Sequence, residues 1–255
     1  MLRLIQADLY RLTRTTSIYV TLIIFIAFFV LSIITESIGT LGVDNEQVNV
    51  AMQALDWNFL TAIQSFSVTA SILIYCFIIF YVHIFSSEFS NRTYKNILMS
   101  GTSRTTYLFS KLSMLFLTII FSTIFIYIIN AIVSLIYYGK PATLPEDFWF
   151  SNLQFILGLT LCIMVYYIVA SFLQILFNSS IAAIVFIVLA PVATQILQVI
   201  QGWDWLKYVD YLSLTQAFGM GLLKGTDLVP YVLVNGCIVI IIIIFNLALL
   251  KTKEF

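Results

Sequence analysis

Six long apolar runs constrain the fold of this chain more than any other feature of its sequence. They occupy residues 17–34, 59–84, 112–137, 153–177, 181–200 and 230–250. About 20 helical residues, at roughly 1.5 Å each, cross the ~30 Å hydrocarbon core of a bilayer. Only 9% of the residues are charged, whereas an ordinary soluble domain carries about 25%. The sequence therefore predicts an all-α, polytopic membrane protein with six transmembrane helices, in one domain that spans residues 1–255.

The segment before the first run, residues 1–15, has the pattern of an amphipathic helix. Its hydrophobic residues share one helical face and its three arginines lie largely off that face, the hydrophobic set being Leu2, Ile5, Leu9 and Leu12. We expect an interfacial helix that lies along the inner leaflet of the membrane. The first run lacks the cleavage site of a signal peptide, so we expect it to be retained as a span.

The basic residues are distributed unevenly between the two sets of connecting segments. Nine of the twelve fall in the segments that would share one side, namely Arg3, Arg11, Arg14, Arg92, Lys95, Arg104, Lys111, Lys251 and Lys253. Only Lys140, Lys207 and Lys224 fall on the other side. The positive-inside rule then predicts a multi-pass protein of the cell membrane with both termini in the cytoplasm.

A polar island, residues 86–111, separates the second run from the third and has the pattern helix, break, helix. Glu88 is expected in a first turn, where a carboxylate complements the positive helix end. Gly101 fits a left-handed helix stop, and Ser103 can cap the next helix. Hydrophobic residues recur about one turn apart and predict an exposed apolar edge, made of Phe89, Tyr94, Ile97 and Leu98.

This island resembles the segment between the second and third spans of ABC-2 type transporter permeases. The matching residues are Glu88, Thr93, Leu98, Gly101, Ser103, Arg104 and Lys111, whereas Arg92 stands where that family usually has glycine. With six spans around it, the resemblance covers the whole chain. A solvated basic loop that obeys the positive-inside rule is the alternative interpretation of the island.

The resemblance implies that the island contains a cytoplasmic coupling helix, which docks on a separate ATP-binding ABC subunit. The coupling residues that it implies are Glu88, Phe89, Arg92, Tyr94, Ile97 and Leu98. ATP and Mg would be bound by that partner subunit, and a second permease copy, identical or different, would complete the transporter. The chain looks most like permeases of Gram-positive peptide exporters, including bacteriocin self-immunity systems and phenol-soluble modulin exporters.

Several kinds of chemistry have no support in the sequence. No charged residue lies in the body of any predicted span, which argues against a proton-coupled antiporter or a channel with a charged filter. No motif of a zinc protease, a serine hydrolase or a phosphate-binding loop occurs. We therefore expect no enzyme activity, no catalytic or metal-binding residue and no cofactor on this chain. A formal net charge of zero gives no support to a nucleic-acid partner.

Neutral polar residues do occur inside the spans, on shared helical faces. Those of the second run are Gln64, Ser67, Ser71 and Tyr75, and those of the fifth include Thr194 and Gln198. Such residues commonly hold helix to helix. The resemblance offers a second interpretation, because it implies a translocation path between two permease copies that involves these two spans. A path without fixed charge suits amphipathic peptides or other hydrophobic cargo.

Residues 201–229 connect the fifth run to the sixth and are rich in interfacial aromatic residues. Asp204, Lys207 and Asp210 are expected to keep one side of this segment wet. The stretch that follows is too short to span a membrane, so we expect an outer re-entrant or surface helix. A plain amphipathic loop helix is the alternative.

Two other classes of function fit the same six spans. A secondary transporter or channel would work without an ATPase, although we find no internal repeat of the kind that many secondary transporters contain. A membrane scaffold or sensor would transport nothing, and cargo would not stimulate ATP hydrolysis in its presence.

Overall fold

Helices account for every regular element in the computed structural model, which describes residues 2–39, 56–91, 93–99, 101–141, 144–203, 205–223 and 225–252. Six of its helical segments are long and apolar enough to cross a membrane. They are α2 (Thr16–Ile34), the second span (Phe59–Ser90), α9 (Arg104–Tyr138), α10 (Phe148–Phe177), α11 (Ser180–Gln201) and α13 (Val229–Thr252). The predicted all-α, polytopic fold is confirmed, and the chain is a multi-pass membrane protein.

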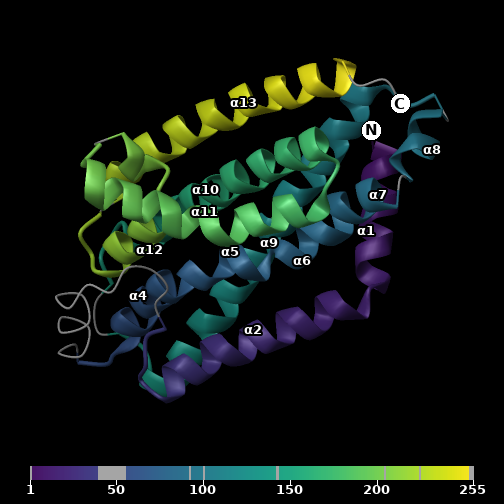
Figure 1. Ribbon diagram of the computed structural model, residues 1–255. Coiled ribbons are helices and arrows are strands. Elements are labelled where there is room, and N and C mark those ends of the chain that lie inside the picture. Colours follow the sequence, from purple (N-terminus) through teal and green to yellow (C-terminus); the bar gives the residue numbers. More distant parts are fainter. Residues whose placement is uncertain are drawn as a thin grey trace.

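The six long segments run side by side in one bundle (Figure 1). Both marked ends of the chain lie at one end of the bundle, together with α1 (Leu2–Arg14), α7 (Ser87–Ser90) and α8 (Tyr94–Met99). We call this the terminal end. The opposite end, which we call the far end, holds α12 (Tyr211–Gly219) and the start of α4 (Phe59–Thr69). Figure 1 also shows that α1 lies across the direction of α2 and does not continue it.

The predicted spans are longer in the structure than in the sequence pattern, and the second and third gain the most residues. The second was expected to end at residue 84, and it continues as helix to Ser90. The third was expected to begin at residue 112, and α9 begins at Arg104. Glu88 and Lys111 therefore lie in the helices of these two spans, just outside the apolar runs that were predicted to carry no charge. Hydropathy ended both runs at these charges, whereas partners inside the bundle neutralise them.

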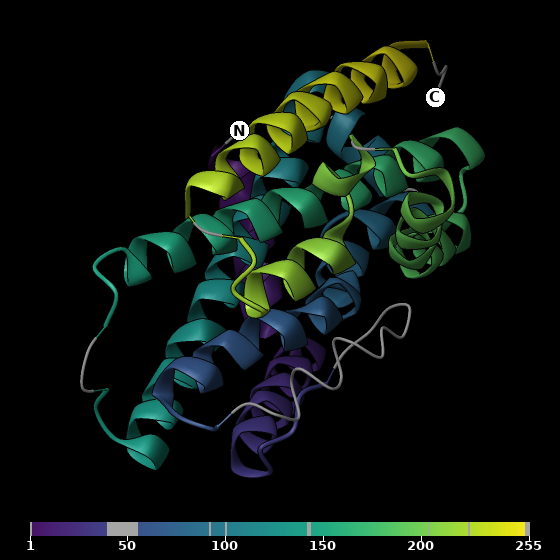
Figure 2. The same cartoon turned by 90° about the vertical axis from the view of Figure 1, so that its left-hand side faces the viewer.

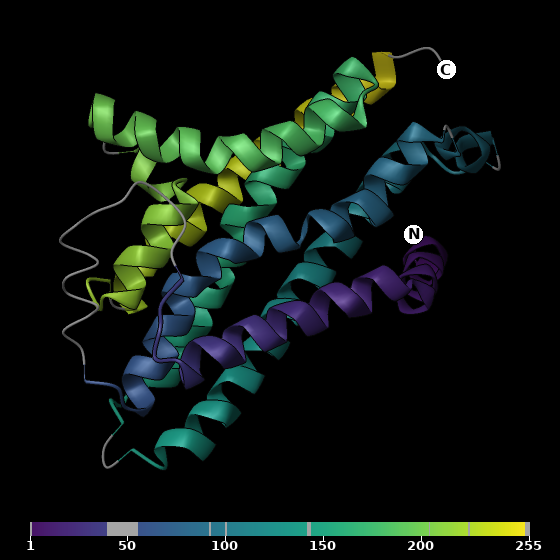
Figure 3. The same ribbon diagram turned by 60° about the horizontal axis from the view of Figure 1, so that its bottom comes forward.

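The second span is a helix with three interruptions. A 3₁₀ turn, η1 (Ala70–Ile72), follows α4, a turn at Phe77 separates α5 (Leu73–Cys76) from α6 (Ile78–Tyr81), and one π-helical turn, η2 (Val82–Ser86), precedes α7. Figure 3 shows this segment running the whole length of the bundle up to α8. Such interruptions leave backbone carbonyls in need of other donors.

Side chains from other helices donate to carbonyls at each interruption. The hydroxyl of Tyr211 on α12 donates to Ala70, and that of Tyr167 on α10 donates to Ile74 at 2.6 Å. The amide of Gln174, also on α10, donates to the carbonyl of Ser86 at 3.2 Å. The irregular backbone is thus satisfied inside the protein, as the membrane interior requires.

The centre of the bundle is α10, which packs against α9, α11, α12 and α13. It is the most buried of the six long segments, whereas α2, α11 and α13 expose most of their surface. Pro191 does not break the fifth span, because α11 runs without interruption from Ser180 to Gln201 with this proline inside it.

The short helix α12 is buried at the far end, where it packs against α4, α10 and α11 (Figure 2). A Cβ at Gly219 would lie 2.1 Å from a side-chain atom of Val68, so only glycine permits this close approach of α12 to α4. The helix is therefore buried among the long helices and is not a helix on the surface of the bundle. Asp204 lies outside the described residues.

Asp210, which was expected to face water, is fully buried at the start of α12. Its side chain accepts hydrogen bonds from the backbone N–H groups of Leu212 at 3.1 Å and Ser213 at 3.2 Å. It is the N-cap of α12. Burial raises the pKa of this carboxyl, and the bonds from Ser213 and Leu212 act in the opposite direction. The prediction of a wet side at Asp210 is wrong, because its carboxylate is buried and caps the first turn of α12.

Candidate functional site

Three segments that are far apart in the sequence meet around a group of buried charges at the terminal end. Asp8 and Arg11 come from α1, Glu88 from α7, and Tyr107 and Lys111 from α9. We call these five residues the ion cluster. Lys111 is only 2% exposed, and Asp8 and Glu88 are buried as well. Two carboxylates and two cations make the ion cluster neutral overall.

The ammonium group of Lys111 is the centre of the ion cluster. Its Nζ donates to both oxygens of Asp8, at 2.7 and 2.9 Å, and to Oε1 of Glu88 at 2.6 Å. Glu88 also accepts from Arg11 Nη1 at 2.9 Å and from the Tyr107 hydroxyl at 2.8 Å. Glu88 thereby contacts all three of its possible partners in the cluster, and Asp8 depends mainly on Lys111.

The position of α1 explains how a polar site forms beside a membrane helix. Asp8 and Arg11 are three residues apart, so they lie on the same side of the helix, and they are also 3.4 Å from each other. Leu12 on the same helix is buried, but Leu9 is exposed. The helix therefore has its charged side against α7 and α9, and only part of its hydrophobic face is covered.

Burial is costly for these charges unless they are paired. It raises the pKa of Asp8, and the nearby Lys111 acts in the opposite direction. Breaking one partner of such a group leaves an uncompensated charge, which is far more harmful than replacing the whole group. The ion cluster therefore links α1, the second span and α9 firmly at this end of the bundle.

Next to the ion cluster, α7 and α8 form a short hairpin that projects from the terminal end (Figure 1). Phe89 stacks on Tyr94 with ring centroids 4.5 Å apart, and Phe85 stacks on Phe89 at 4.9 Å. Phe89 is 8% exposed and Tyr94 6%. The predicted exposed edge is wrong for these two residues, because their rings pack inward on the protein's own helices.

The other predicted coupling residues differ in their surroundings. Ile97 is partly buried and packs against the core. Glu88 lies in the first turn of α7, as expected, and its carboxylate is buried in the ion cluster. Arg92 lies outside the described residues, as does the side chain of Leu98. Sequence reasoning did not single out Met99, the last residue of α8, whose side chain is 78% exposed.

The connection from α8 to α9 follows the sequence prediction closely. Gly101 has a φ of +91°, a left-handed conformation that favours glycine. The hydroxyl of Ser103 accepts a hydrogen bond from the backbone of Thr106 at 3.2 Å and caps α9. Arg104 donates to the carbonyl of Leu250 near the end of α13, at 2.8 Å. The hairpin is thus followed at once by a capped helix that also holds α13.

The predicted path residues of the second span have different surroundings. Ser67 and Ser71 are fully buried, and Tyr75 is half-buried. Gln64 lines a cavity of about 670 Å³ at the far end, together with the acidic pair Glu146 and Asp147. Gln64 is thus the member of this set that lines the far-end cavity.

The predicted path residues of the fifth span contact neighbouring elements of the same chain. The hydroxyl of Thr194 lies 2.8 Å from that of Tyr166 on α10. The side-chain oxygen of Gln198 accepts from the Ser213 hydroxyl of α12 at 3.2 Å. Because Gly219 of α12 also lies against Gln64, the two polar faces lie on either side of α12.

Sequence reasoning missed Asp8, Tyr107 and Lys111 as parts of a site. Lys111 was counted only among the basic residues of the inner side and among the residues of the ABC-2 resemblance. One signal was present, because Lys111 directly precedes a long apolar run and is followed by no polar connector. Among the described residues, no group of three or more histidine, cysteine or acidic residues is arranged to hold a metal ion.

Comparison with known proteins gives a family but no activity. No curated protein matches the sequence significantly. Residues 39–253 match the model of a family described as proteins of unknown function, DUF2705. This match includes five of the six spans and the whole hairpin, although not α1. Because it covers well over half of the sequence, the chain belongs to the DUF2705 family.

Proposed function

We propose that this chain is the membrane subunit of an ATP-driven exporter of the ABC-2 type. A separate ATP-binding subunit would hydrolyse ATP with Mg, and a second permease copy would complete the transporter. The cargo we propose is an amphipathic peptide, of the antimicrobial or toxin kind, or another hydrophobic molecule. The observation that carries the proposal is the α7–α8 hairpin, which projects from the terminal end and is linked to two spans and α1 by the ion cluster.

The ion cluster suits the hairpin to transmit a movement. A partner that displaces α8 also displaces α7, and Glu88 on α7 is bonded to Lys111 of α9 and Arg11 of α1. ATP binding and hydrolysis on the partner would bias the bundle between inward-facing and outward-facing states. The work is mechanical, so this chain needs no catalytic residue of its own.

The proposed orientation has the terminal end in the cytoplasm. Arg11, Arg14, Lys95 and Arg104 are at this end, and Lys140 and Lys207 belong to the connectors of the far end. Basic residues are retained on the cytoplasmic side of membranes. An ATP-binding partner is also cytoplasmic, so the hairpin and the basic residues favour the same orientation.

The surface proposed for docking differs from the one that periodicity alone favours. Phe89 and Tyr94 hold the hairpin together from inside, and Met99 is the large exposed apolar side chain at its tip. A flexible, exposed methionine next to Lys95 suits a partner cleft with an apolar floor and an acidic rim. Met99 and Ile97 are therefore the residues that we expect to contact the ATP-binding subunit.

The route proposed for cargo passes α12 at the far end. Gln64 lines the cavity of about 670 Å³ there, with Phe148, Phe218 and the acidic pair Glu146 and Asp147 also in its wall. Aromatic and acidic side chains together suit an amphipathic peptide that carries positive charge. Ser67, Ser71 and Thr194 lie deeper, where opening of the bundle would be needed to expose them.

A test uses the chain and a candidate ATP-binding subunit purified together and returned to lipid vesicles. We expect a stable complex whose ATP hydrolysis is stimulated by exported peptide. Met99→Asp should weaken the complex, and Leu222→Asp, a change of a 70% exposed side chain at the far end, should not. Transport by the chain in the absence of any ATP-binding subunit would instead favour a secondary transporter or channel. No transport and no stimulated hydrolysis in any pairing would favour a scaffold or sensor.

A further inference from the structure

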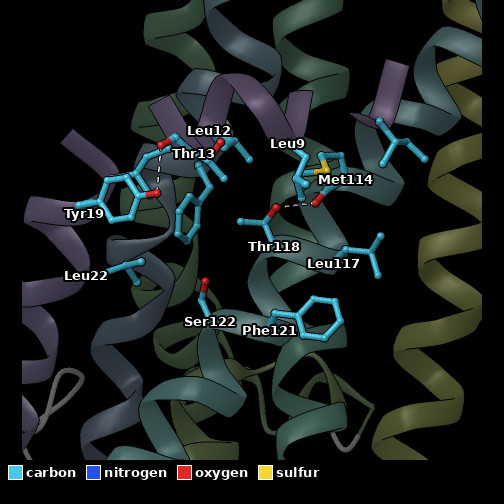
Figure 4. Close-up of a pocket in the computed structure, with 13 residues that line it drawn as sticks. Leu9, Leu12, Thr13, Tyr19, Leu22, Met114, Leu117, Thr118, Phe121 and Ser122 are labelled. Atoms are coloured by element: carbon cyan, nitrogen blue, oxygen red, sulfur yellow. Dashed lines mark hydrogen bonds between the residues drawn. The ribbon is translucent and has the colours of Figure 1, made fainter. Parts of the chain in front are cut away.

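An apolar cavity of about 300 Å³ lies between α1, α2 and α9 at the terminal end (Figure 4). It is distinct from the ion cluster and from the cavity at the far end. Leu9 and Leu12 of α1 lie above it in Figure 4, and Leu22, Met114 and Phe121 line it from α2 and α9. Its few polar side chains include Thr118, whose hydroxyl already donates to the carbonyl of Met114 at 2.7 Å.

The cavity is elongated and open to the surface of the bundle. Its lining on α9 extends from Met114 to Ser122, which is about 12 Å along a helix axis. Leu9, Tyr19 and Phe121 at its walls are all exposed. In a membrane, this opening faces hydrocarbon just below the level of the interfacial helix α1. An unbranched apolar chain can therefore enter it from the side.

A positive charge stands at the interfacial end of the same cavity. Arg14 follows Thr13, a lining residue, at the point where α1 ends and the chain turns into α2. Its side chain is exposed, and within the part of the chain that the structure describes it forms no ion pair with a carboxylate. A phosphate group at the membrane surface would lie within the reach of this guanidinium.

We propose that this cavity binds one acyl chain of an anionic phospholipid, whose phosphate is held by Arg14. The occupant follows from three features together: an apolar lining, a lateral opening into the hydrocarbon, and an exposed cation at the interfacial end that stacks on Tyr10 and has no carboxylate partner among the described residues. The lipid would fill the space beneath α1, the helix that also supplies Asp8 and Arg11 to the ion cluster. Binding would therefore stabilise the packing of α1 on α9.

The test counts lipids on the purified full-length chain by native mass spectrometry. The chain is stripped of lipid in detergent and then supplied with phosphatidylglycerol or with phosphatidylcholine of the same acyl chains. We expect wild-type protein to retain one phosphatidylglycerol. Ser122→Phe, which fills the deep end of the cavity, should lower the retained fraction about tenfold.

Matched variants keep the test decisive. Ile128→Phe adds the same ring to an exposed position of α9 outside the cavity and should retain the lipid. Thr118→Leu is a milder cavity change for use if Ser122→Phe does not fold. Arg14→Gln should remove the preference for phosphatidylglycerol over phosphatidylcholine. Equal retention by the cavity variants and Ile128→Phe, or no retained phospholipid on wild-type protein, would overturn the proposal. Because the chain is tested alone, this result does not depend on the proposed export function.

Discussion

Lys111 donates two hydrogen bonds to the carboxylate of Asp8, at 2.7 and 2.9 Å, across 103 residues of sequence. With Lys111 removed, Asp8 would keep only the longer contact to Arg11 at 3.4 Å. The interaction is thus a direct link between the N-terminal helix and the third span.

Lys111→Met should lower the free energy of unfolding by about 3–5 kcal/mol, because it leaves buried carboxylates without their main cation. Adding Asp8→Asn should restore part of this loss, since the unpaired charge is then gone. The measurement is denaturant unfolding in detergent, with the exposed change Lys140→Met as the control. If the change in unfolding free energy of the double variant equals the sum of the changes in the two single variants, Lys111 and Asp8 are not coupled.

The stability of the protein should also depend on the ionisation of Asp8. Burial raises the pKa of this carboxyl above its ordinary value of 3.8, so the folded chain keeps the proton at pH values where the unfolded chain has released it. The contribution of Asp8 to stability therefore falls as the pH rises from 3.8 through the raised pKa, and is constant above it. Asp8→Asn should remove this part of the pH dependence, and the exposed change Asp147→Asn should not. If the stability of Asp8→Asn changes with pH as steeply as that of the wild type, the pH dependence does not come from Asp8.

The two sides of the hairpin should respond differently to truncation. Tyr94→Ala removes a buried ring that stacks on Phe89, and we expect a loss of about 3 kcal/mol in unfolding free energy. Met99→Ala should change stability by less than about 0.5 kcal/mol, because the side chain is exposed. Under the proposed function, Met99→Ala should nevertheless weaken binding of the ATP-binding subunit, as measured by co-purification. If a stable Met99→Ala protein binds the ATP-binding subunit as well as the wild type does, Met99 is not part of the docking surface.

The neutral polar residues of the second span allow path and packing roles to be separated. The Ser67 hydroxyl is buried and has no hydrogen-bond partner among the described residues. Ser67→Ala should therefore be neutral or stabilise the fold by up to about 1 kcal/mol. Gln64→Leu, at the wall of the far-end cavity, should alter peptide transport in vesicles while the complex still assembles. If Gln64→Leu only lowers stability and leaves transport per folded complex unchanged, Gln64 serves packing and not the path.

The proposed orientation can be tested directly on intact cells. Single cysteines at Lys95 and Asp147, in a background without the three native cysteines, report the two ends of the bundle. An impermeant thiol reagent should label position 147 and spare position 95, because positive-inside topology keeps Lys95 in the cytoplasm. Permeabilised cells provide the control, in which both positions should react. Labelling of position 95 from outside would show that the proposed membrane orientation is wrong. The hairpin would then not face a cytoplasmic ATP-binding subunit.

The number of spans and the caps around the hairpin could be predicted because each depends on local sequence. Hydrophobic length alone specifies the six helices, and Gly101 and Ser103 end and begin helices through their own backbone and hydroxyl group. The ends of the second and third spans could not be predicted in this way. Those ends depend on whether Glu88 and Lys111 meet a partner, and that partner lies on α1, far away in the sequence.

The periodicity of hydrophobic residues also could not predict which part of the protein an apolar helix face packs against. The spacing of Phe89 and Tyr94 shows that they share a surface, but not which neighbour covers it. In the structure that neighbour is the chain itself, through Phe85 and Tyr107. Asp210 was misjudged for a similar reason, since an acidic residue in an aromatic connector looks solvated unless its role as a helix cap is recognised.

The three interruptions of the second span have a further consequence for its stiffness. An unbroken helix resists bending along its whole length, because any bend disturbs a continuous series of backbone hydrogen bonds. Here the regular series is interrupted at η1, Phe77 and η2, and the carbonyls of Ala70, Ile74 and Ser86 accept hydrogen bonds from Tyr211, Tyr167 and Gln174. Bending of this span therefore concentrates at three fixed points, and each bend requires the release of one side-chain hydrogen bond from α10 or α12. Under the proposed function, the order in which these bonds break would decide whether a displacement at the hairpin reaches the far end or stops partway along the span.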